Sequence, residues 1–253
     1  MDDFPEHLDP QLEAIAELEA AFAQHIPLPD PVAQDATCLL DAIDLILSAR
    51  MVREAHIEQV IEQSVHAFGR IEPVFVQRLA LERTATESFL EVRQRIAQYA
   101  EHLHEEDLMR LSMLPKRFAD GDGSAALEGM ALVIIGRARC GEYTSDVASA
   151  LIAALRLSIR AQQNLAQTTA DALTRIGTSD RPSAGELARI QRASREFDEV
   201  ALVGASLANV ATGIDSQSAA TVRIVVDTAL AGGDVRVAAL SLAQIAERAR
   251  GVA

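Results

Sequence analysis

The chain has 253 residues, 49% of them hydrophobic and 24% charged, with a formal net charge of −14. This composition excludes a wholly disordered chain and makes duplex DNA, or any nucleic acid, an unfavourable partner. Two distant cysteines, an acidic start and the lack of a long uncharged apolar run predict neither a disulfide framework nor an export signal nor a membrane span, so we expect a cytoplasmic protein.

Residue usage changes near residues 120–124, where two glycines alternate with two aspartates before a serine. All six histidines precede this point, and the first 49 residues contain 11 acids and no lysine or arginine. The distal half is rich in Ala, Gly and Ser and is nearly balanced in charge. We therefore expect an acidic helical half over 1–120 and a small-residue helical half over 121–253. The two halves could also form one continuous domain.

Helical signals recur along the whole chain. Pro10 and Pro31 each follow an aspartate, as at the first position of a helix, and Ser183 with Glu186 has capping-box spacing. Apolar residues recur with a period near 3.6, and glycines follow several periodic stretches. The pattern predicts helices over 10–26, 33–50, 54–69, 74–104, 105–119, 124–140, 144–177, 184–212, 216–231 and 234–250, with breaks considered within 74–104, near Gln162 and near Asp198.

The predicted fold class is all-α. Only residues 222–226 are β-like, and they lie in a stretch that keeps the helical period. Counting possible breaks, we expect about ten to twelve helices in a multi-helix bundle or an irregular α-solenoid.

The last 36 or so residues resemble one HEAT-type helical repeat. The likeness rests on Ala229 and Leu230 in a first helix, a tight turn at Asp234, and Val235-Arg236 with Ala239 opening a second helix. Ala243 stands where the family has a leucine, and no period near 40 residues extends through the chain. The resemblance implies stacked helical hairpins with a surface for protein binding.

Two motifs suggest catalysis but lack the groups it needs. Residues 200–208 look like the nucleophile elbow of α/β-hydrolases around Ser206, yet the last histidine, His104, comes before this serine. We interpret them as a small-residue helix interface. Glu101 and His104 have the Glu-x-x-His spacing of di-iron bundles, but the motif occurs once.

The segment that begins at Asp120 resembles the start of a calcium loop but has Ala125 and Ala131 where such a loop needs glycine and glutamate. We therefore read it as a turn that caps the helix beginning near Ser124. No metal or cofactor site is predicted from these motifs.

The leading functional hypothesis is a non-enzymatic protein-interaction or regulatory module with an acidic N-terminal surface. A partner with a basic surface would bind acidic residues on the predicted helices. Association of the chain into a homo-oligomer is also possible. The candidate partner-binding residues are Glu13, Glu17, Asp35, Asp41 and Asp44.

A small-molecule-responsive helical sensor is the alternative, and a metal-dependent enzyme that uses carboxylates and histidine is the third hypothesis. The sensor would bind its ligand among the aromatic residues of the first half. Its candidate pocket residues are Phe68, Phe75, Phe89 and Tyr99.

Overall fold

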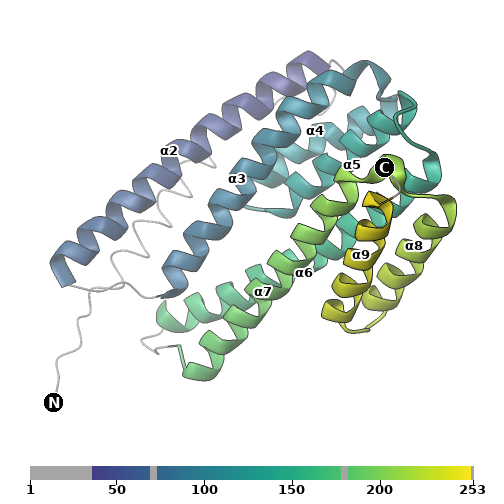
Figure 1. Cartoon of the computed structure of the whole chain (residues 1–253). Helices are drawn as coiled ribbons and strands as arrows, with labels where there is room; N and C mark the ends of the chain where they lie inside the picture. Colours follow the sequence, from purple (N-terminus) through teal and green to yellow (C-terminus); the bar gives the residue numbers. More distant parts are fainter. Residues whose placement is uncertain (1–35, 69–72, 178–181, 252–253) are drawn as a thin grey trace.

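The computed structural model describes residues 36–68, 73–177 and 182–251 (Figure 1). Within these ranges the chain forms eight α-helices and two 3₁₀ turns and no strand, which confirms the all-α prediction. The helix expected over 10–26 lies outside the described residues. The elements are α2 (Ala36–Phe68), α3 (Pro73–Tyr99), η2 (Ala100–His102), α4 (Glu105–Ala119), α5 (Ser124–Arg139), α6 (Ser145–Gly177), α7 (Ala184–Asn209), η3 (Ala211–Gly213), α8 (Ser216–Leu230) and α9 (Val235–Arg250).

Helix ends follow the local chemistry of the sequence. The predicted capping box is present at the start of α7, where the amide of Glu186 donates to Oγ of Ser183 at 3.2 Å and the amide of Ser183 donates to the Glu186 carboxylate at 2.8 Å. Gly141 follows α5 with φ of 81° and Gly232 follows α8 with φ of 110°. Residues with side chains rarely adopt this backbone conformation, so glycine ends both helices.

Several predicted boundaries differ from the structure. The helices expected over 33–50 and 54–69 are one helix, α2, because residues 51–53 contain no glycine or proline to interrupt it. Helix α6 continues through Gln162, and α7 continues through Asp198. Conversely, the stretch expected over 74–104 breaks after Tyr99 into η2. In the described part of the chain, eight helices therefore stand in place of the nine predicted there, because two predicted helices are joined in α2.

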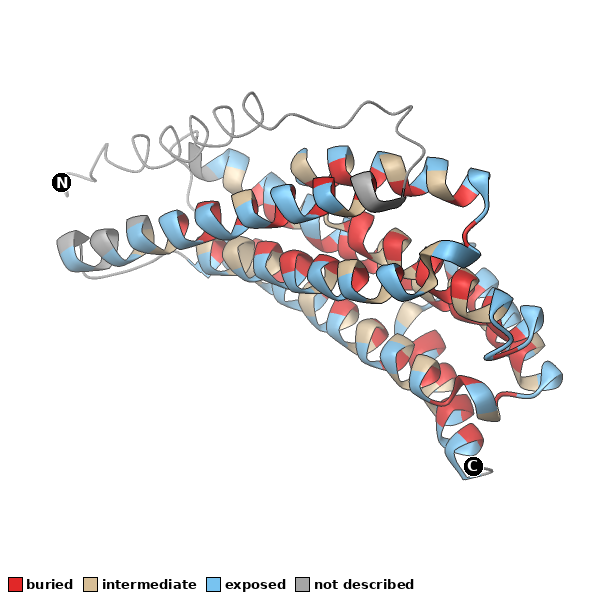
Figure 2. Cartoon of the chain, turned by 90° about the horizontal axis from the view of Figure 1, so that it is seen from above, coloured by how far each residue is buried: buried red, intermediate tan, exposed pale blue. Residues whose placement is uncertain are grey.

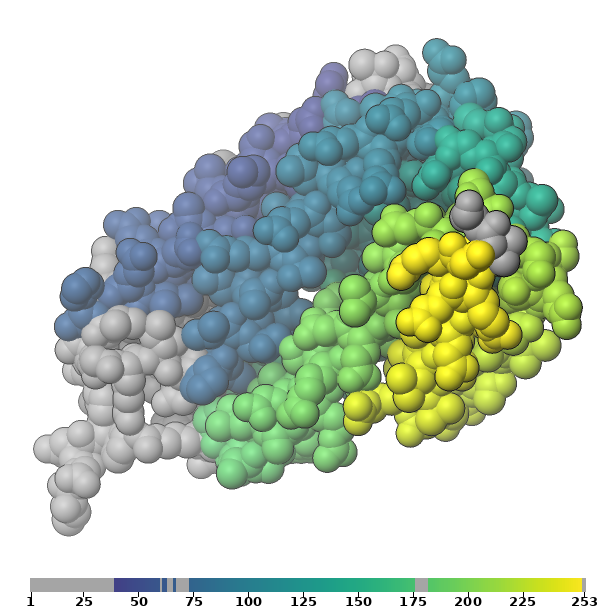
Figure 3. Space-filling model, viewed as in Figure 1, coloured from purple at the N-terminus to yellow at the C-terminus, as the bar shows by residue number. Residues whose placement is uncertain are grey.

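The long helix α6 lies at the centre of the arrangement and packs against α3, α5, α7 and α8. Helices α2 and α3 pack together on one flank, whereas α8 and α9 form a hairpin at the other (Figure 1). The space-filling view shows α9, in yellow, against α7, in green (Figure 3). In the described part of the chain, no helix combines the length and the apolar character needed to cross a membrane.

Buried residues form stripes along the inner faces of the helices (Figure 2). One apolar cluster joins the inner faces of α2 to α5, and a second joins α6 to α9 with the end of α5. A third, smaller cluster lies between the start of α3, the distal half of α6 and the first half of α7. Helix α5 contributes to the first two clusters, so the two predicted halves share a packed boundary rather than a linker.

Candidate functional site

A pocket of about 380 Å³ opens where α2 and α3 face the middle of α6. Arg50 and Arg53 of α2 and Arg78 and Glu82 of α3 form one wall, and Gln162 of α6 lies in another. The turn between α4 and α5 closes one side with residues 121–124. The volume is in the range of small-molecule sites, and the polar groups converge on it from four separate elements.

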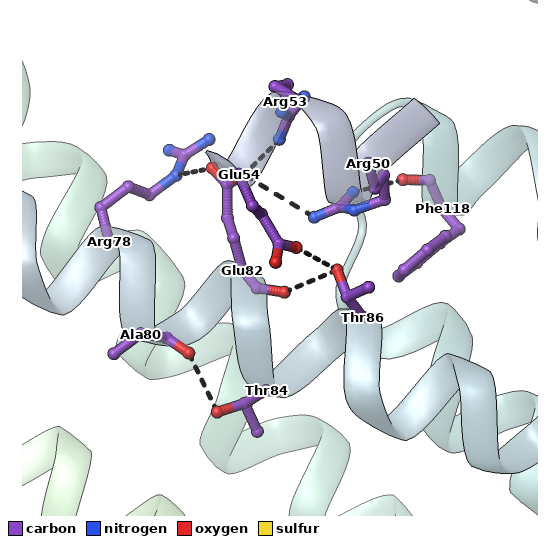
Figure 4. Close-up of polar contacts among 9 residues, drawn as sticks. All are labelled: Arg50, Arg53, Glu54, Arg78, Ala80, Glu82, Thr84, Thr86 and Phe118. Carbon is purple, nitrogen blue, oxygen red and sulfur yellow. Dashed lines mark hydrogen bonds and ion pairs between the residues drawn. The ribbon is translucent and has the colours of Figure 1, made fainter. Parts of the chain in front are cut away.

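Arg50 is buried but has an incomplete set of hydrogen-bond acceptors. Its Nη1 donates to the carbonyl oxygen of Phe118 at 2.7 Å, and its guanidinium lies 4.3 Å from the centroid of the Phe118 ring (Figure 4). Its Nε has no partner in the described structure, and Nη2 is 3.9 Å from the Glu82 carboxylate, beyond hydrogen-bond distance. One edge of this buried cation is therefore left without an acceptor.

Glu82 is occupied by the other two arginines of the wall. Nη2 of Arg53 donates to its Oε2, and Nε of Arg78 donates to its Oε1 at 2.7 Å (Figure 4). Arg53 resembles Arg50 in having a buried Nε without an acceptor. Both oxygens of Glu82 already accept from these neighbours, so this carboxylate forms an ion pair with Arg50 at 3.9 Å but no hydrogen bond.

A fourth charged residue, Glu54, lies beside this cluster and is also buried. Its Oε1 accepts a hydrogen bond from the hydroxyl of Thr86 on α3 (Figure 4). The wall between α2 and α3 thus contains a polar network in a position where packed helices usually bury apolar side chains. Such networks are costly unless every polar atom has a hydrogen-bond partner. The guanidinium nitrogens that lack one therefore raise the cost of burying this network.

The pKa directions agree with this geometry. Burial, followed by the positive charge of Arg53, lowers the pKa of Arg50 to about 10, against the opposing effects of Glu82 and Glu54. Burial raises the pKa of Glu82, but the charges and hydrogen bonds of Arg53 and Arg78 outweigh it, so its pKa lies below the ordinary value. The charge of Glu82 is thus well compensated, whereas burial and Arg53 disfavour the charge of Arg50 more than Glu82 and Glu54 favour it.

Gln162 faces this wall from α6 and is also buried, with 6% of its surface exposed. Its Oε1 has no donor in the described structure. Gly123 allows this arrangement, because a Cβ at that position would lie 2.8 Å from Nε2 of Gln162. Oε1 of Gln162, like Nε of Arg50 and Nε of Arg53, is therefore buried without a hydrogen-bond partner beside the pocket.

The turn between α4 and α5 forms one wall of the pocket, and its charged side chains are paired with residues of the same segment. Asp122 accepts from Nε of Arg117 at 2.9 Å and from the amide of Ser124 at 3.0 Å, and Arg117 also pairs with Glu128 at 2.5 Å. Partial burial raises the pKa of Asp122, but the hydrogen bonds from Ser124 and the hydrogen bonds and charge of Arg117 outweigh it, so the pKa lies below its ordinary value. The segment that resembles a calcium loop thus forms a turn whose Asp122 caps α5 through Ser124, as expected.

The predicted aromatic pocket residues lie in other places. Phe89 is fully buried and its ring stacks on that of Phe118, with centroids 4.0 Å apart. Phe75 packs in the small third cluster, and the Tyr99 hydroxyl donates to Glu142 at 2.6 Å. The side chain of Phe68 lies outside the described residues. The three described residues are not among those that line the pocket between α2, α3 and α6.

Of the predicted acidic surface residues, Asp41 and Asp44 are described and are exposed on α2. Asp44 is bound bidentately by Arg93, whose Nε and Nη2 donate at 2.9 and 2.7 Å. Glu13, Glu17 and Asp35 lie outside the described residues. The structure therefore gives Asp44 a partner within the chain and leaves Asp41 on the surface.

The Glu-x-x-His motif does not lie on one helix face. Glu101 is in η2, whereas His104 precedes the first residue of α4 and caps it, with its amide donating to Asp107 at 3.3 Å. The helix breaks between the two residues, so the spacing that suggested a shared face does not produce one. Among the described residues, no group of three or more His, Cys, Asp or Glu side chains is placed to hold a metal ion.

Comparisons with known proteins found no matching family model, no similar curated protein and no similar solved structure.

Proposed function

We propose that this chain is a ligand-responsive helical domain whose pocket between α2, α3 and α6 binds a small anionic molecule. The observation that supports the proposal most directly is Arg50, a buried guanidinium with no carboxylate within hydrogen-bond distance. Arg50 shares the single carboxylate of Glu82 with Arg53 and Arg78, and these three arginines line the pocket. An anion in the pocket would add negative charge beside this excess of buried positive charge.

Binding accounts for these side chains better than acid–base catalysis does. Arginine guanidinium groups and the glutamine amide hold charge and hydrogen bonds but do not exchange protons near neutral pH. Both carboxylates closest to the pocket, Glu82 and Asp122, have lowered pKa values and are bound by arginines. None of these three kinds of group is poised to transfer a proton at neutral pH.

The chain could respond to the ligand because the walls of the pocket belong to different helices. The arginines are on α2 and α3, whereas Gln162 is on α6, which also packs against α5, α7 and α8. A ligand that contacts both walls would bind best when the helices are at one fixed separation. It would thereby shift the population toward that arrangement and transmit its presence to the distal helices.

Thermal melts of the full chain in acetate, sulfate and phosphate test the proposal. At least one of these anions should raise the melting temperature in a saturable way, because a ligand that binds only the folded state stabilises it by mass action. An Arg50→Met variant should lose this rise, since methionine fills similar space without charge. The matched control is Arg93→Met, which removes a surface arginine that pairs with Asp44 on the same two helices. The proposal is wrong if no anion stabilises the wild type, or if Arg50→Met responds as the wild type does.

A protein-interaction module is the second candidate function, and an exposed face of α2 supports it. Asp41, Leu45, Ser48 and Val52 follow helical spacing and are all exposed, with Val52 at 62%. Exposed apolar side chains beside an acid suit an amphipathic basic segment of a partner. This is the surface that we expect to bind a protein with a basic face.

A variant with Asp41→Asn, Leu45→Ser and Val52→Ser tests this candidate. It should keep the melting temperature and reduce the affinity for a synthetic basic amphipathic helix, most strongly at low salt. The matched control places Ile224→Ser and Leu240→Ser on α8 and α9, where both side chains are equally exposed. Equal binding of the peptide by both variants and the wild type would remove the support for α2.

A further inference from the structure

We infer that the outer surface shared by α7 and α9 docks an acidic amphipathic helix of a partner protein. This α7–α9 surface consists of Arg192, Arg195 and Leu202 of α7 and of Arg236 and Leu240 of α9. None of these residues lines the pocket between α2, α3 and α6, so the inference goes beyond the proposed function. It follows from the register of the two helices, from their exposed leucines and from two arginines without a carboxylate.

Two contacts show that α7 and α9 run side by side in the same direction. Arg236, in the first turn of α9, donates to the Glu199 carboxylate of α7 through Nε at 3.2 Å and Nη2 at 3.3 Å. Gly213, which follows α7, lies close to the carbonyl group of Ala249, near the end of α9. The space-filling view shows the two helices together on one face of the molecule (Figure 3).

This register places two exposed leucines on the same side of the helix pair. Leu202 follows Glu199 by three residues, and Leu240 follows Arg236 by four. Residues at these spacings share a helix face, so both leucines lie next to the pair that Arg236 forms with Glu199. Leu202 is 70% exposed and Leu240 is 68% exposed, the highest values among the large apolar side chains that the structure describes.

The surface continues into a basic end. A hollow of about 280 Å³ opens between the first half of α7 and the start of α9, and Arg192, Arg195 and Arg236 line it. In the described part of the chain, neither Arg192 nor Arg195 forms a hydrogen bond or an ion pair with a carboxylate. Both are exposed, and they share the helix face of Leu202 because positions 192, 195, 199 and 202 follow steps of three and four.

The acids near this hollow leave the two arginines unpaired. Glu199 pairs with Arg236, and the Asp234 carboxylate caps α9 by accepting from the amides of Arg236 and Val237 at 2.8 and 3.3 Å. Glu196 also lines the hollow but forms no ion pair with any described arginine. Arginines that lack a carboxylate within the chain, next to exposed leucines, suit a partner that has both acidic and apolar side chains.

A partner helix suits this surface better than a small anion does. Exposed arginines alone bind an anion weakly, because the charges stay solvated. A segment that also covers the leucines buries apolar surface, and an amphipathic helix can lie along the line between two neighbouring helices. Arg195 and Leu202 are about 10 Å apart along α7, so the partner helix needs its acids and its apolar side chains two turns apart.

The charge of the chain would confine such a helix to this surface. Acidic residues outnumber lysine and arginine by 37 to 23, so an acidic helix is repelled by most of the chain. The α7–α9 surface combines unpaired positive charge with exposed apolar side chains.

A fluorescence anisotropy titration of the full chain with a synthetic peptide tests the inference. The probe is a labelled helix of about 18 residues with two glutamates one turn apart and two leucines two turns further on. The matched probe has glutamine in place of both glutamates. At low salt the glutamate peptide should bind about tenfold more tightly than the glutamine peptide. This difference should shrink as added salt screens the charges.

Two double variants assign the contacts. Arg192→Gln with Arg195→Gln should bind the glutamate peptide about tenfold more weakly at low salt and should bind the glutamine peptide as the wild type does. Leu202→Ser with Leu240→Ser should weaken both peptides about tenfold at every salt concentration, because salt does not screen apolar contacts. All four side chains are exposed, so both variants should keep the wild-type melting temperature.

The matched controls make the same changes elsewhere on the surface. Arg156→Gln with Arg160→Gln removes two exposed arginines one turn apart on α6, which line neither the pocket nor the hollow. Leu45→Ser with Val52→Ser removes two exposed apolar side chains from α2. Both controls should bind the glutamate peptide as tightly as the wild type.

Three results would overturn the inference. Equal affinity of the wild type for the two peptides at low salt, or binding of neither, would remove the requirement for acids without recourse to any variant. Wild-type affinity in the leucine variant would mean that charge alone holds the peptide. If sedimentation shows that the chain self-associates and that the leucine variant does not, a second copy covers this surface in place of an acidic partner.

Discussion

Arg50 and Phe118 are joined through two different parts of Phe118. The Arg50 guanidinium lies 4.3 Å from the centroid of the Phe118 ring, and its Nη1 donates to the Phe118 carbonyl oxygen at 2.7 Å. That carbonyl belongs to the last turn of α4 and also accepts from the amide of Gly121 at 3.1 Å, so Arg50 supplies it with a second donor. Arg50 therefore both caps α4 and holds it against α2.

The first prediction concerns this double contact. Arg50→Ala should lower the free energy of unfolding by about 3 kcal/mol, because it leaves a cavity and removes the donor to the Phe118 carbonyl. Arg50→Met should recover much of the loss by filling the cavity. Urea denaturation measures both, with Arg93→Ala as the surface control, for which we expect a loss below about 1 kcal/mol. Equal losses for Arg50→Ala and Arg93→Ala would contradict this account.

The second prediction concerns the pH dependence of stability. The folded-state pKa of Glu82 is lowered, so the stabilisation from its ionised form is present above the unfolded-state pKa and is lost as the pH falls through the folded-state value. Glu82→Gln should cost about 3 kcal/mol at neutral pH, because it leaves buried arginines without their carboxylate. The difference from the wild type should shrink as the pH falls below about 4.

Denaturation at several pH values tests the second prediction. The matched control is Glu91→Gln, which removes a surface acid that pairs with Arg95 on the same helix. That variant should lose less than about 1 kcal/mol at every pH. A cost of Glu82→Gln that stays constant down to acid pH would show that its charge does not contribute the stabilisation.

The helical period of the sequence could have predicted the α2 and α3 side of this site. On α2 the buried positions follow alternating steps of four and three residues, and arginine occupies two of them. They are Leu39, Ile43, Ile46, Arg50, Arg53 and Ile57. On α3 the same spacing places Glu82 in line with Ala85, Phe89, Val92 and Ile96. Charged residues at core positions of two helices indicate a buried polar site.

The fold class was predictable, whereas the contribution of α6 to the pocket was not. Periodicity and caps identify helices from local sequence, and they correctly marked the starts of α4, α5 and α7. The polar residue Gln162 suggested a break in a helix, but the structure buries it within an unbroken α6. Whether a polar residue ends a helix or enters a polar core depends on what faces it, and Gly123 and the arginines face it from distant parts of the chain.

The third prediction compares two glycines that occupy different surroundings. A Cβ at Gly213 would lie 2.6 Å from the carbonyl oxygen of Ala249, and backbone atoms of α9 cannot move away as a flexible side chain can. Gly213→Ala should therefore lower the free energy of unfolding by about 2 kcal/mol. At Gly185, in the first turn of α7, the nearest atom is 3.8 Å away, so Gly185→Ala should raise stability by about 0.5 kcal/mol. Opposite signs in urea denaturation are expected, and a stabilising Gly213→Ala would contradict the close approach.

The fourth prediction separates the pocket from the stability of the fold through Gly123. Its φ of −61° is open to any residue, so an alanine there is not strained by the backbone. The added Cβ would meet Nε2 of Gln162 at 2.8 Å, and the end of that side chain can swing away at little cost. Gly123→Ala should therefore change the free energy of unfolding by less than about 1 kcal/mol.

The same substitution should alter the pocket, because the Gln162 amide would be displaced from the turn. Its side-chain NH₂ resonances should shift in a ¹⁵N correlation spectrum. Gly185→Ala, which lies in α7 and outside the pocket lining, should leave these resonances unchanged. An unchanged Gln162 signal in Gly123→Ala would mean that the turn does not position this amide.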